Sequence, residues 1–190
     1  MLRRIRLHRT QGSSAEMNIE IEIVTGDPAW PRVKPLFDLV WPPETSAERP
    51  WGTVAFARPD LRVIVEADEQ PVAHVGLHRR EGIWRERPIR IGGIGDVLTH
   101  PDFRRQGLAS LAIDAALHTL RDERSNDFAL LFCTAEMASF YTSRNWKPYM
   151  GEVFAEQDGK RVRFESLQPL VYYLKRAPHE GELDLCGLPW

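Results

Sequence analysis

The 190-residue sequence has little of several features that mark large classes of proteins. It contains two cysteines, Cys133 and Cys186, which lack metal-ligand spacing and are too few for a disulfide framework. Its formal net charge is −2, whereas proteins that bind nucleic acid usually carry a strong basic excess. No apolar run approaches the length needed to span a bilayer, and no internal repeat is visible. These absences argue against a nucleic-acid or membrane partner and favour a cytoplasmic protein.

The composition favours one compact domain. Hydrophobic residues make up 43% of the chain and charged residues 27%, which suits a single core. The N-terminal segment is basic and lacks the apolar core of a secretory signal, so we expect residues 1–17 to form a disordered extension. A basic arm for an acidic surface is the alternative. The folded domain is expected at residues 18–176, followed by a tail at residues 177–190.

The stretch Ile91–Ala109 joins a strand to the start of a helix. Ile94–Thr99 is apolar and β-branched, and the glycines before and inside it indicate a bulge or a close backbone approach. Pro101 ends this strand. The next apolar residues follow helical spacing: Leu108, Leu111, Ala112, Ala115 and Ala116. Arg104 and Arg105 therefore precede a helix N-terminus.

This helix start is suited to binding a phosphate. The first turn of a helix has unpaired N–H groups and a partial positive charge, to which Arg104 and Arg105 add, and Gly107 allows close approach. Acidic residues usually occupy a first turn, so arginines there favour a bound anion. An ordinary solvated basic turn is the alternative.

Two separated segments resemble the GNAT superfamily of N-acyltransferases. The motif Arg104-x-x-Gly107-x-Ala109 is similar to the acyl-CoA signature of that family, Q/R-x-x-G-x-G/A. Residues 138–146 resemble its late helix, A-x-x-F-Y-x-x-x-G-F, with Asn145 in place of the usual glycine. Asparagine is the next residue best able to adopt the left-handed conformation needed there. The resemblance covers residues 19–174.

The resemblance implies an α/β (α+β) fold, in which a mixed, mostly antiparallel central sheet is flanked by helices. The fourth and fifth strands of that fold splay apart at a bulge. The order of elements in this sequence agrees with it. Strands are expected at residues 19–24, 61–66, 72–77, 94–99, 128–133, 152–155, 161–165 and 171–174, with helical segments at 30–40, 108–116 and 138–146.

The resemblance also implies acetyl-CoA as co-substrate and no metal. Main-chain atoms of Val97, Leu98 and Thr99 would bind the pantetheine arm and the acetyl carbonyl. The pyrophosphate would be held by Arg104, Arg105, Gln106, Gly107, Leu108 and Ala109. His74 and His78 share a strand face, but no third metal ligand is spaced nearby.

Direct acetyl transfer to an amine needs a base for the ammonium group and a proton donor for the leaving thiolate. The resemblance implies Tyr141 as the donor. Asp96 is the candidate base, acting directly or through water, and a polar residue at a bulge is its alternative role. Cys133 closes an apolar strand, where burial raises the pKa of a thiol, so no covalent enzyme intermediate is expected.

Within the family, the sequence is most similar to the aminoglycoside 2′-N-acetyltransferases, through residues 78–85 (HRREGIWR) and a tail that ends in tryptophan. The tail would then fold toward the acceptor site. Acceptor contacts are implied for Glu44, Glu48, His78, Asp184 and the Trp190 carboxylate, with solvated loop carboxylates as the alternative for the two glutamates.

The central-strand glutamate of those enzymes corresponds to Gly95, and Asp96 follows it. A one-residue shift moves a side chain to the other sheet face unless a bulge restores it.

We therefore predict an N-acetyltransferase that acts on a primary amine of a small polar acceptor, such as an aminoglycoside. A peptide or protein amine, a larger acyl donor and a non-catalytic acyl-CoA sensor are the alternatives. A homodimer through the last strands is left open, because a core strand equally explains the apolar and aromatic residues of Val171–Leu174.

Overall fold

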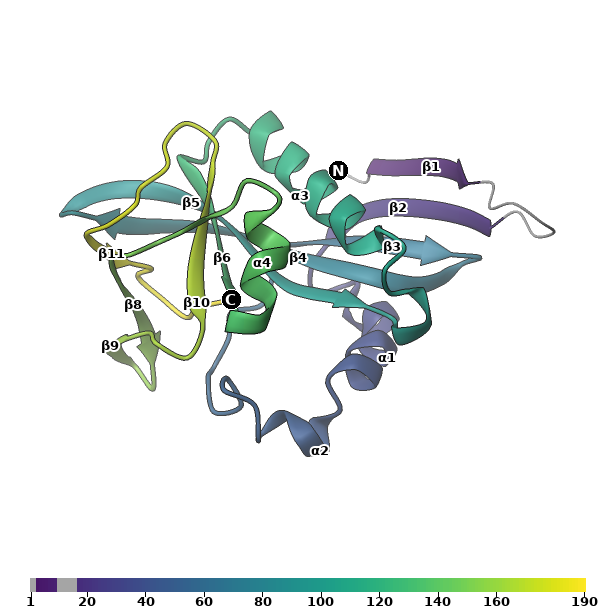
Figure 1. Ribbon diagram of the computed structural model, residues 1–190, viewed down its shortest axis with the longest axis horizontal. Helices are drawn as coiled ribbons and strands as arrows, with labels where there is room; N and C mark the ends of the chain where they lie inside the picture. The colour runs from purple at the N-terminus through teal and green to yellow at the C-terminus, as the bar shows by residue number, and fades with distance from the viewer. Residues whose placement is uncertain (1–2, 10–16) are drawn as a thin grey trace.

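The computed structural model describes residues 3–9 and 17–190, and side chains from residue 18 onward (Figure 1). The strands are β1 (Arg3–Arg9), β2 (Met17–Thr25), β3 (Leu61–Ala67), β4 (Gln70–Trp84), β5 (Arg87–Thr99), β6 (Phe128–Cys133), β7 (Lys147–Pro148), β8 (Glu152–Gln157), β9 (Lys160–Arg163), β10 (Gln168–Tyr173) and β11 (Glu182–Asp184). The helices are α1 (Trp30–Val40), α2 (Pro43–Ser46), α3 (Leu108–Asp122) and α4 (Ala135–Thr142), with a 3₁₀ turn at Pro101–Phe103.

The strands form one mixed sheet in the order β1-β2-β3-β4-β5-β6-β10-β7, and β11 joins β4 to β8 and β9. Among the described strands, β5–β6 and β8–β11 are the parallel pairs, and the other pairs are antiparallel. This arrangement confirms the expected mixed, mostly antiparallel sheet flanked by helices. None of the helices in the described part of the chain combines the length and apolar character needed to cross a membrane.

Residues 3–9 form a strand where the sequence indicated disorder. β1 pairs with β2 along its whole length, with Arg3 opposite Ile23 and Arg9 opposite Met17. This pairing satisfies backbone groups that would otherwise stand unpaired along the edge of β2. Residues 1–2 and 10–16 of the expected extension lie outside the described residues.

The two faces of the sheet have different coverings. Successive side chains of a strand point to opposite faces. Val63 of β3 packs in one core cluster with the buried residues of α3, whereas the next residue, Ile64, packs with Ala29 and Val33 at α1. Helix α3 therefore covers one face and α1 the other. The tail after β10 packs on the second face, where Leu183 and Trp190 join a separate core cluster.

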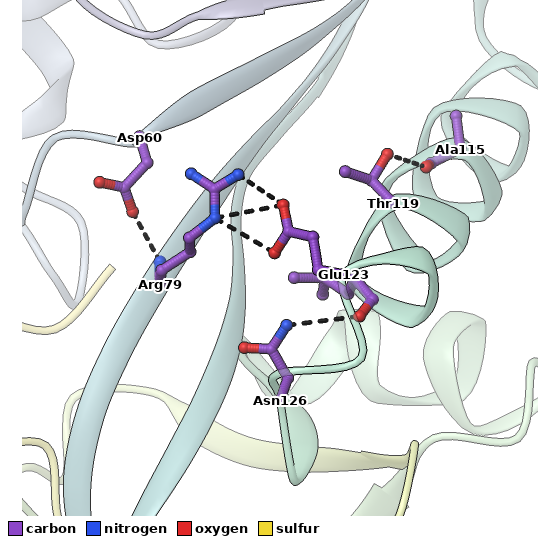
Figure 2. Close-up of polar contacts among 7 residues, drawn as sticks. Asp60, Arg79, Ala115, Thr119, Glu123 and Asn126 are labelled. Atoms are coloured by element: carbon purple, nitrogen blue, oxygen red, sulfur yellow. Dashed lines mark hydrogen bonds and ion pairs between the residues drawn. The ribbon is translucent and has the colours of Figure 1, made fainter. Parts of the chain in front are cut away.

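Polar contacts join the C-terminal end of α3 to β4 (Figure 2). Arg79 of β4 forms an ion pair with Glu123, and its backbone N–H donates to Asp60 Oδ2 at 2.6 Å. The side-chain amide of Asn126 donates to the carbonyl of Leu120 at 3.4 Å, which satisfies one of the last helical carbonyls. These contacts fix the direction of α3 relative to β4 and β5.

Strands β5 and β6 pair over a short segment and then separate. Ile91–Ile94 lies parallel to Phe128–Leu131, and no pairing between the two strands follows in the described chain. On its other edge, β5 contains an extra residue: Gly76 of β4 lies opposite Gly95, but His74 lies opposite Leu98. The expected splay and the expected bulge are both present.

Candidate active site

The turn between β5 and α3 has the geometry of an anion cradle. Arg104 is extended, Arg105 has φ +61° and Gly107 has φ +82°, so the chain turns sharply before α3 begins at Leu108. A Cβ at Gly107 would meet no heavy atom within 4 Å, so backbone conformation rather than crowding favours glycine. The cradle is open, both arginines are exposed, and the first N–H groups of α3 have no acceptor within the helix.

Arg144 is a third arginine at this helix start, and the sequence analysis missed it. It follows α4, and its Nε donates to Ser110 Oγ in the first turn of α3 at 3.0 Å. Its Nη1 donates to the carbonyl of Phe140 at 2.8 Å, and its guanidinium lies 3.9 Å from the centre of the Phe140 ring. Its place inside the late-helix motif was the available sequence signal. These contacts join α4 to the start of α3.

The bulge in β5 places Asp96 on the face that α1 covers. Asp96 has a left-handed backbone, with φ +49°. An ideal Cβ at Gly76 would lie 3.3 Å from Asp96 Oδ2, so this carboxyl group lies over Gly76. Gly76 shares its face with His74 and His78, because alternate residues of β4 point the same way. Without the extra residue, the one-residue shift from Gly95 would turn the Asp96 side chain to the other face of the sheet. The bulge keeps it on the same face as His74 and His78.

The surroundings of Asp96 favour its protonated form more than water does. Burial raises the pKa of the Asp96 carboxyl to about 6, although the positive charge of Arg62 opposes this shift. The side chain remains partly exposed. A carboxyl group with this pKa is largely ionised at neutral pH and can accept a proton reversibly.

The tail returns to the same face. The Trp190 indole stacks on the His78 ring with centroids 5.5 Å apart and planes at 22°, and its Nε1 donates to the carbonyl of Leu130 at 3.2 Å. An ideal Cβ at Gly95 would lie 3.1 Å from the main-chain carbonyl carbon of Trp190 and 3.5 Å from His78 Nε2. The carboxyl end of Trp190 therefore lies beside Gly95, next to Asp96 in the chain.

His78 is neutral and buried, and its ring offers a hydrogen-bond acceptor atom. Burial lowers the pKa of its imidazole to about 3, and Arg80 adds to this effect. The backbone of Arg58 opposes this shift, and Nε2 of the ring is buried with no partner among the described residues. His78 Nε2 is thus available to a hydrogen-bond donor that enters beside Gly95.

Tyr141 lies on α4, near the end of β6. It is 5% exposed. Burial raises the pKa of the Tyr141 phenol above its usual value, with a further rise from the Cys133 thiol and an opposing effect of Arg144. Burial also raises the pKa of Cys133 to about 11, which makes this thiol a poor nucleophile. Tyr141 therefore stays protonated and can donate.

The other expected acceptor contacts are Asp184, Glu44 and Glu48. Asp184 of β11 lies opposite Ile83, well along β4 from His78, and it forms an ion pair with Arg161. Glu44 and Glu48 are exposed on the connection between α1 and β3.

That connection reaches the tail, since the N–H of Ala57 donates to the carbonyl of Pro189 at 2.7 Å. Among the described residues, no group of three side chains could hold a metal ion.

Comparison with known proteins agrees with this geometry. Residues 30–146 match the family model of the acetyltransferase (GNAT) family. An aminoglycoside 2′-N-acetyltransferase of Mycolicibacterium fortuitum is 30% identical over 80 residues, which are 42% of this chain and 40% of that protein. The match thus spans less than half the length of this relative.

Two solved structures share the fold across most of the chain. A GNAT family N-acetyltransferase (YhbS) from Escherichia coli, in complex with CoA, has a TM-score of 0.54 over 94% of both chains at 13% identity. A GNAT family acetyltransferase from Brucella melitensis, in complex with acetyl-CoA, has a TM-score of 0.54 over 86% of this chain and 94% of that one, also at 13% identity. With the family match over residues 30–146, these findings show that the chain belongs to the GNAT family of acetyltransferases.

Proposed function

We propose that this protein is an N-acetyltransferase that uses acetyl-CoA and transfers the acetyl group directly to a primary amine of a small polar acceptor. The observation that carries this proposal is the bulge of β5. It turns the carboxyl group of Asp96 over Gly76 of β4, and Asp96 lies on the strand that separates from β6 beyond Ile94 and leads into the α3 cradle. A base and an anion site are thereby joined by one short segment.

The unpaired edge of β5 supports a pantetheine site. Beyond Ile94 this strand has no partner among the described residues on its β6 side, and we propose that main-chain groups of Val97, Leu98 and Thr99 pair there with an amide-containing arm. The Thr99 carbonyl also accepts from Arg104 Nε at 3.4 Å. The pyrophosphate would then reach the helix start, where the open space at Gly107 fits a bound anion. The holding residues are Arg104, Arg105, Gln106, Gly107, Leu108 and Ala109. Bound acetyl-CoA supplies the activated acetyl thioester.

Asp96 acts as the base in this proposal. Its carboxyl accepts a proton from the ammonium group of the acceptor, directly or through one water molecule, so that the neutral amine attacks the acetyl carbon. His78 Nε2, a buried acceptor without a partner, and the Trp190 carboxylate beside Gly95 hold the N–H groups of the amine. Three acceptor groups on one face suit a cationic amine.

Tyr141 acts as the proton donor. Its raised pKa keeps the hydroxyl protonated until the thiolate leaves. The hydroxyl then gives its proton to the CoA sulfur, and the C–S bond breaks as the amide bond forms. The proton that the amide nitrogen loses passes to the Tyr141 phenolate through solvent and restores the hydroxyl. No residue is acylated, in agreement with the high pKa of Cys133.

An aminoglycoside or a similar polyamine is the proposed acceptor. The similarity to the Mycolicibacterium fortuitum enzyme supports this class. The exposed carboxylates Glu44 and Glu48, on the connection that reaches the tail, add negative charge suited to a polycation. Asp184 is not included in the proposal, because Arg161 already pairs with it.

The test is acetyl-CoA turnover, followed by thiol release, against aminoglycosides with and without a 2′-amine, polyamines, amino acids and short peptides. Acetyl-CoA binding is measured in parallel by calorimetry. We expect turnover with 2′-amine aminoglycosides, and loss of turnover with retained binding in Asp96→Asn and Tyr141→Phe.

Asp158→Asn and Tyr173→Phe are the matched controls, since Asp158 is an exposed left-handed residue and Tyr173 is 60% exposed. Turnover with peptides alone would make a peptide amine the acceptor. Binding with no turnover across the panel would favour the sensor, and no binding would overturn the proposal.

A further inference from the structure

Arg62 of β3 is a buried cation that lacks a carboxylate partner. It is 3% exposed, and the ion pairs of the described residues do not include it, although the charges of Asp96 and Asp27 act on it over a longer distance and favour its charged form. Its Nε donates to the carbonyl of Gly26 at 2.8 Å, and its guanidinium lies 5.1 Å from the Trp30 ring centre and 5.8 Å from that of Phe37. A buried charge without an ion pair is costly. Its retention therefore needs an explanation.

The remaining bond of Arg62 decides the protonation of His74. Arg62 Nη1 lies 3.0 Å from His74 Nε2, and a guanidinium has hydrogens to donate but no lone pair to offer. His74 Nε2 must therefore accept, which puts the ring proton on Nδ1. Burial lowers the pKa of His74 to about 3, so the ring keeps this single neutral form over the working pH range.

The fixed proton on His74 points at the bulge. His74 Nδ1 lies 2.8 Å from the main-chain carbonyl oxygen of Asp96, so the ring donates to the residue that forms the bulge. Side chains with a Cβ rarely adopt the left-handed backbone that Asp96 has. The hydrogen bond from His74 Nδ1 to the main-chain carbonyl of Asp96 fixes the orientation of the peptide that follows Asp96. This fixes the backbone of Asp96 and, with it, the direction of its carboxyl group.

We propose that Arg62 and His74 are positioning residues that lock the bulge and keep the Asp96 carboxyl on the acceptor face of the sheet. Neither residue touches the amine. The inference rests on the proposed function, in which this carboxyl is the base. The charged or titratable groups around it are Arg62 from β3, His74 and His78 from β4, and the carboxyl end of Trp190 from the tail.

Two variants of nearly equal shape isolate the bond from His74 to the bulge. His74→Asn retains an N–H at the place of Nδ1, whereas His74→Leu has a methyl group there, and neither has an acceptor at the place of Nε2. The first readout is the pKa of the Asp96 carboxyl, measured by ¹³C NMR titration without any acceptor present. We expect His74→Asn to keep the raised value near 6 and His74→Leu to fall toward the ordinary 3.8, as the carboxyl turns into water.

The second readout is turnover with the acceptor found in the panel. We expect kcat of His74→Leu to be about tenfold or more below that of His74→Asn, with equal acetyl-CoA affinity. The difference between the two variants should vanish when each is combined with Asp96→Asn, because the effect acts through that carboxyl.

Equal Asp96 pKa values in the two variants would overturn the inference, and so would a difference in turnover that persists without the carboxyl. If Asp96→Asn alone leaves turnover intact, the base assignment of the proposed function fails, while the carboxyl titration still decides the positioning role. Should His74→Leu not fold, ¹⁵N NMR of the unmodified protein decides. A proton on Nε2 of His74 would contradict the proposed hydrogen bonds from Arg62 to His74 and from His74 to Asp96, and a proton on Nδ1 supports them.

Discussion

The indole of Trp190 occupies the space that a side chain at Gly93 would need. An ideal Cβ there would approach the ring to 2.4 Å, which is far below van der Waals contact. Gly93 lies opposite His78 in the β4–β5 ladder, so Trp190, His78 and Gly93 meet at one place.

We predict that Gly93→Ala displaces Trp190. Overpacking of this kind costs about 1–3 kcal/mol of unfolding free energy, measurable by urea denaturation. The KM for the acceptor should rise, because the carboxyl end of Trp190 moves with its ring. Gly92→Ala is the matched control: its methyl group meets Leu120 of α3 on the opposite face. A rise of KM in both variants, or in neither, would contradict a specific role of the tail.

The pKa of Asp96 predicts the pH dependence of turnover. A base must be ionised to accept a proton, so kcat/KM should rise with pH and level off above about 6. Asp96→Asn should remove this limb and lower kcat by about 10²-fold or more at pH 8. A limb that survives in Asp96→Asn at the same pH would assign the titration to another group.

The same shift has an opposite consequence for stability. The folded protein binds the Asp96 proton more tightly than the unfolded chain, since the folded pKa is about 6 and the ordinary value is 3.8. This group therefore contributes stability below about pH 4, and the contribution is lost as pH rises through about 6.

Asp96→Asn changes the unfolding free energy by one amount at pH 4 and by another at pH 8. We expect the change at pH 8 to be more stabilising than the change at pH 4, by on the order of 1 kcal/mol. Denaturant unfolding at the two pH values measures this difference, with Asp158→Asn as the control. An equal effect of Asp96→Asn at both values would show that the carboxyl is not destabilised by folding.

Arg144 should contribute to the affinity for acetyl-CoA. Its guanidinium lies at the first turn of α3, where a positive charge favours a bound anion. We predict that Arg144→Gln weakens acetyl-CoA binding by about fivefold in calorimetry, with a larger loss at low salt. Arg124→Gln, at the other end of α3, should leave the affinity unchanged. If both variants bind acetyl-CoA with equal affinity, Arg144 has only a structural role, in which it joins α4 to the start of α3.

The sequence predicts those elements whose signals are local. The glycines and β-branched residues of 91–99, followed by Pro101 and the motif from Arg104 to Ala109, indicate strand, bulge and helix start in the correct order. The bulge was also the condition under which Asp96 would reach the acceptor face. The structure meets that condition through the left-handed backbone of Asp96. The catalytic and binding roles of these residues stay predictions.

Other features depend on contacts between distant segments. β4 extends to Trp84, well past the expected 72–77, because its turn uses Arg85 and Glu86 in left-handed conformations without glycine or asparagine. The contact between Arg62 and His74 joins the neighbouring strands β3 and β4, and no sequence pattern predicts it. The ion pair that occupies Asp184 comes from Arg161 of β9, which the motif around the tail does not include.

The contact of Trp190 with Gly93 joins two segments that are far apart in the chain, and this separation predicts the order in which the two parts of the proposed site form. The proposed acyl-CoA part of the site lies within residues 91–146, where Arg144 and Ser110 are in contact 34 residues apart in the chain. The acceptor half closes a much longer loop, and long-range contacts form late in folding. Refolding should therefore restore acetyl-CoA binding before it restores acceptor turnover. The turn before α3 should form first, and the packing of Trp190 beside His78 should form last.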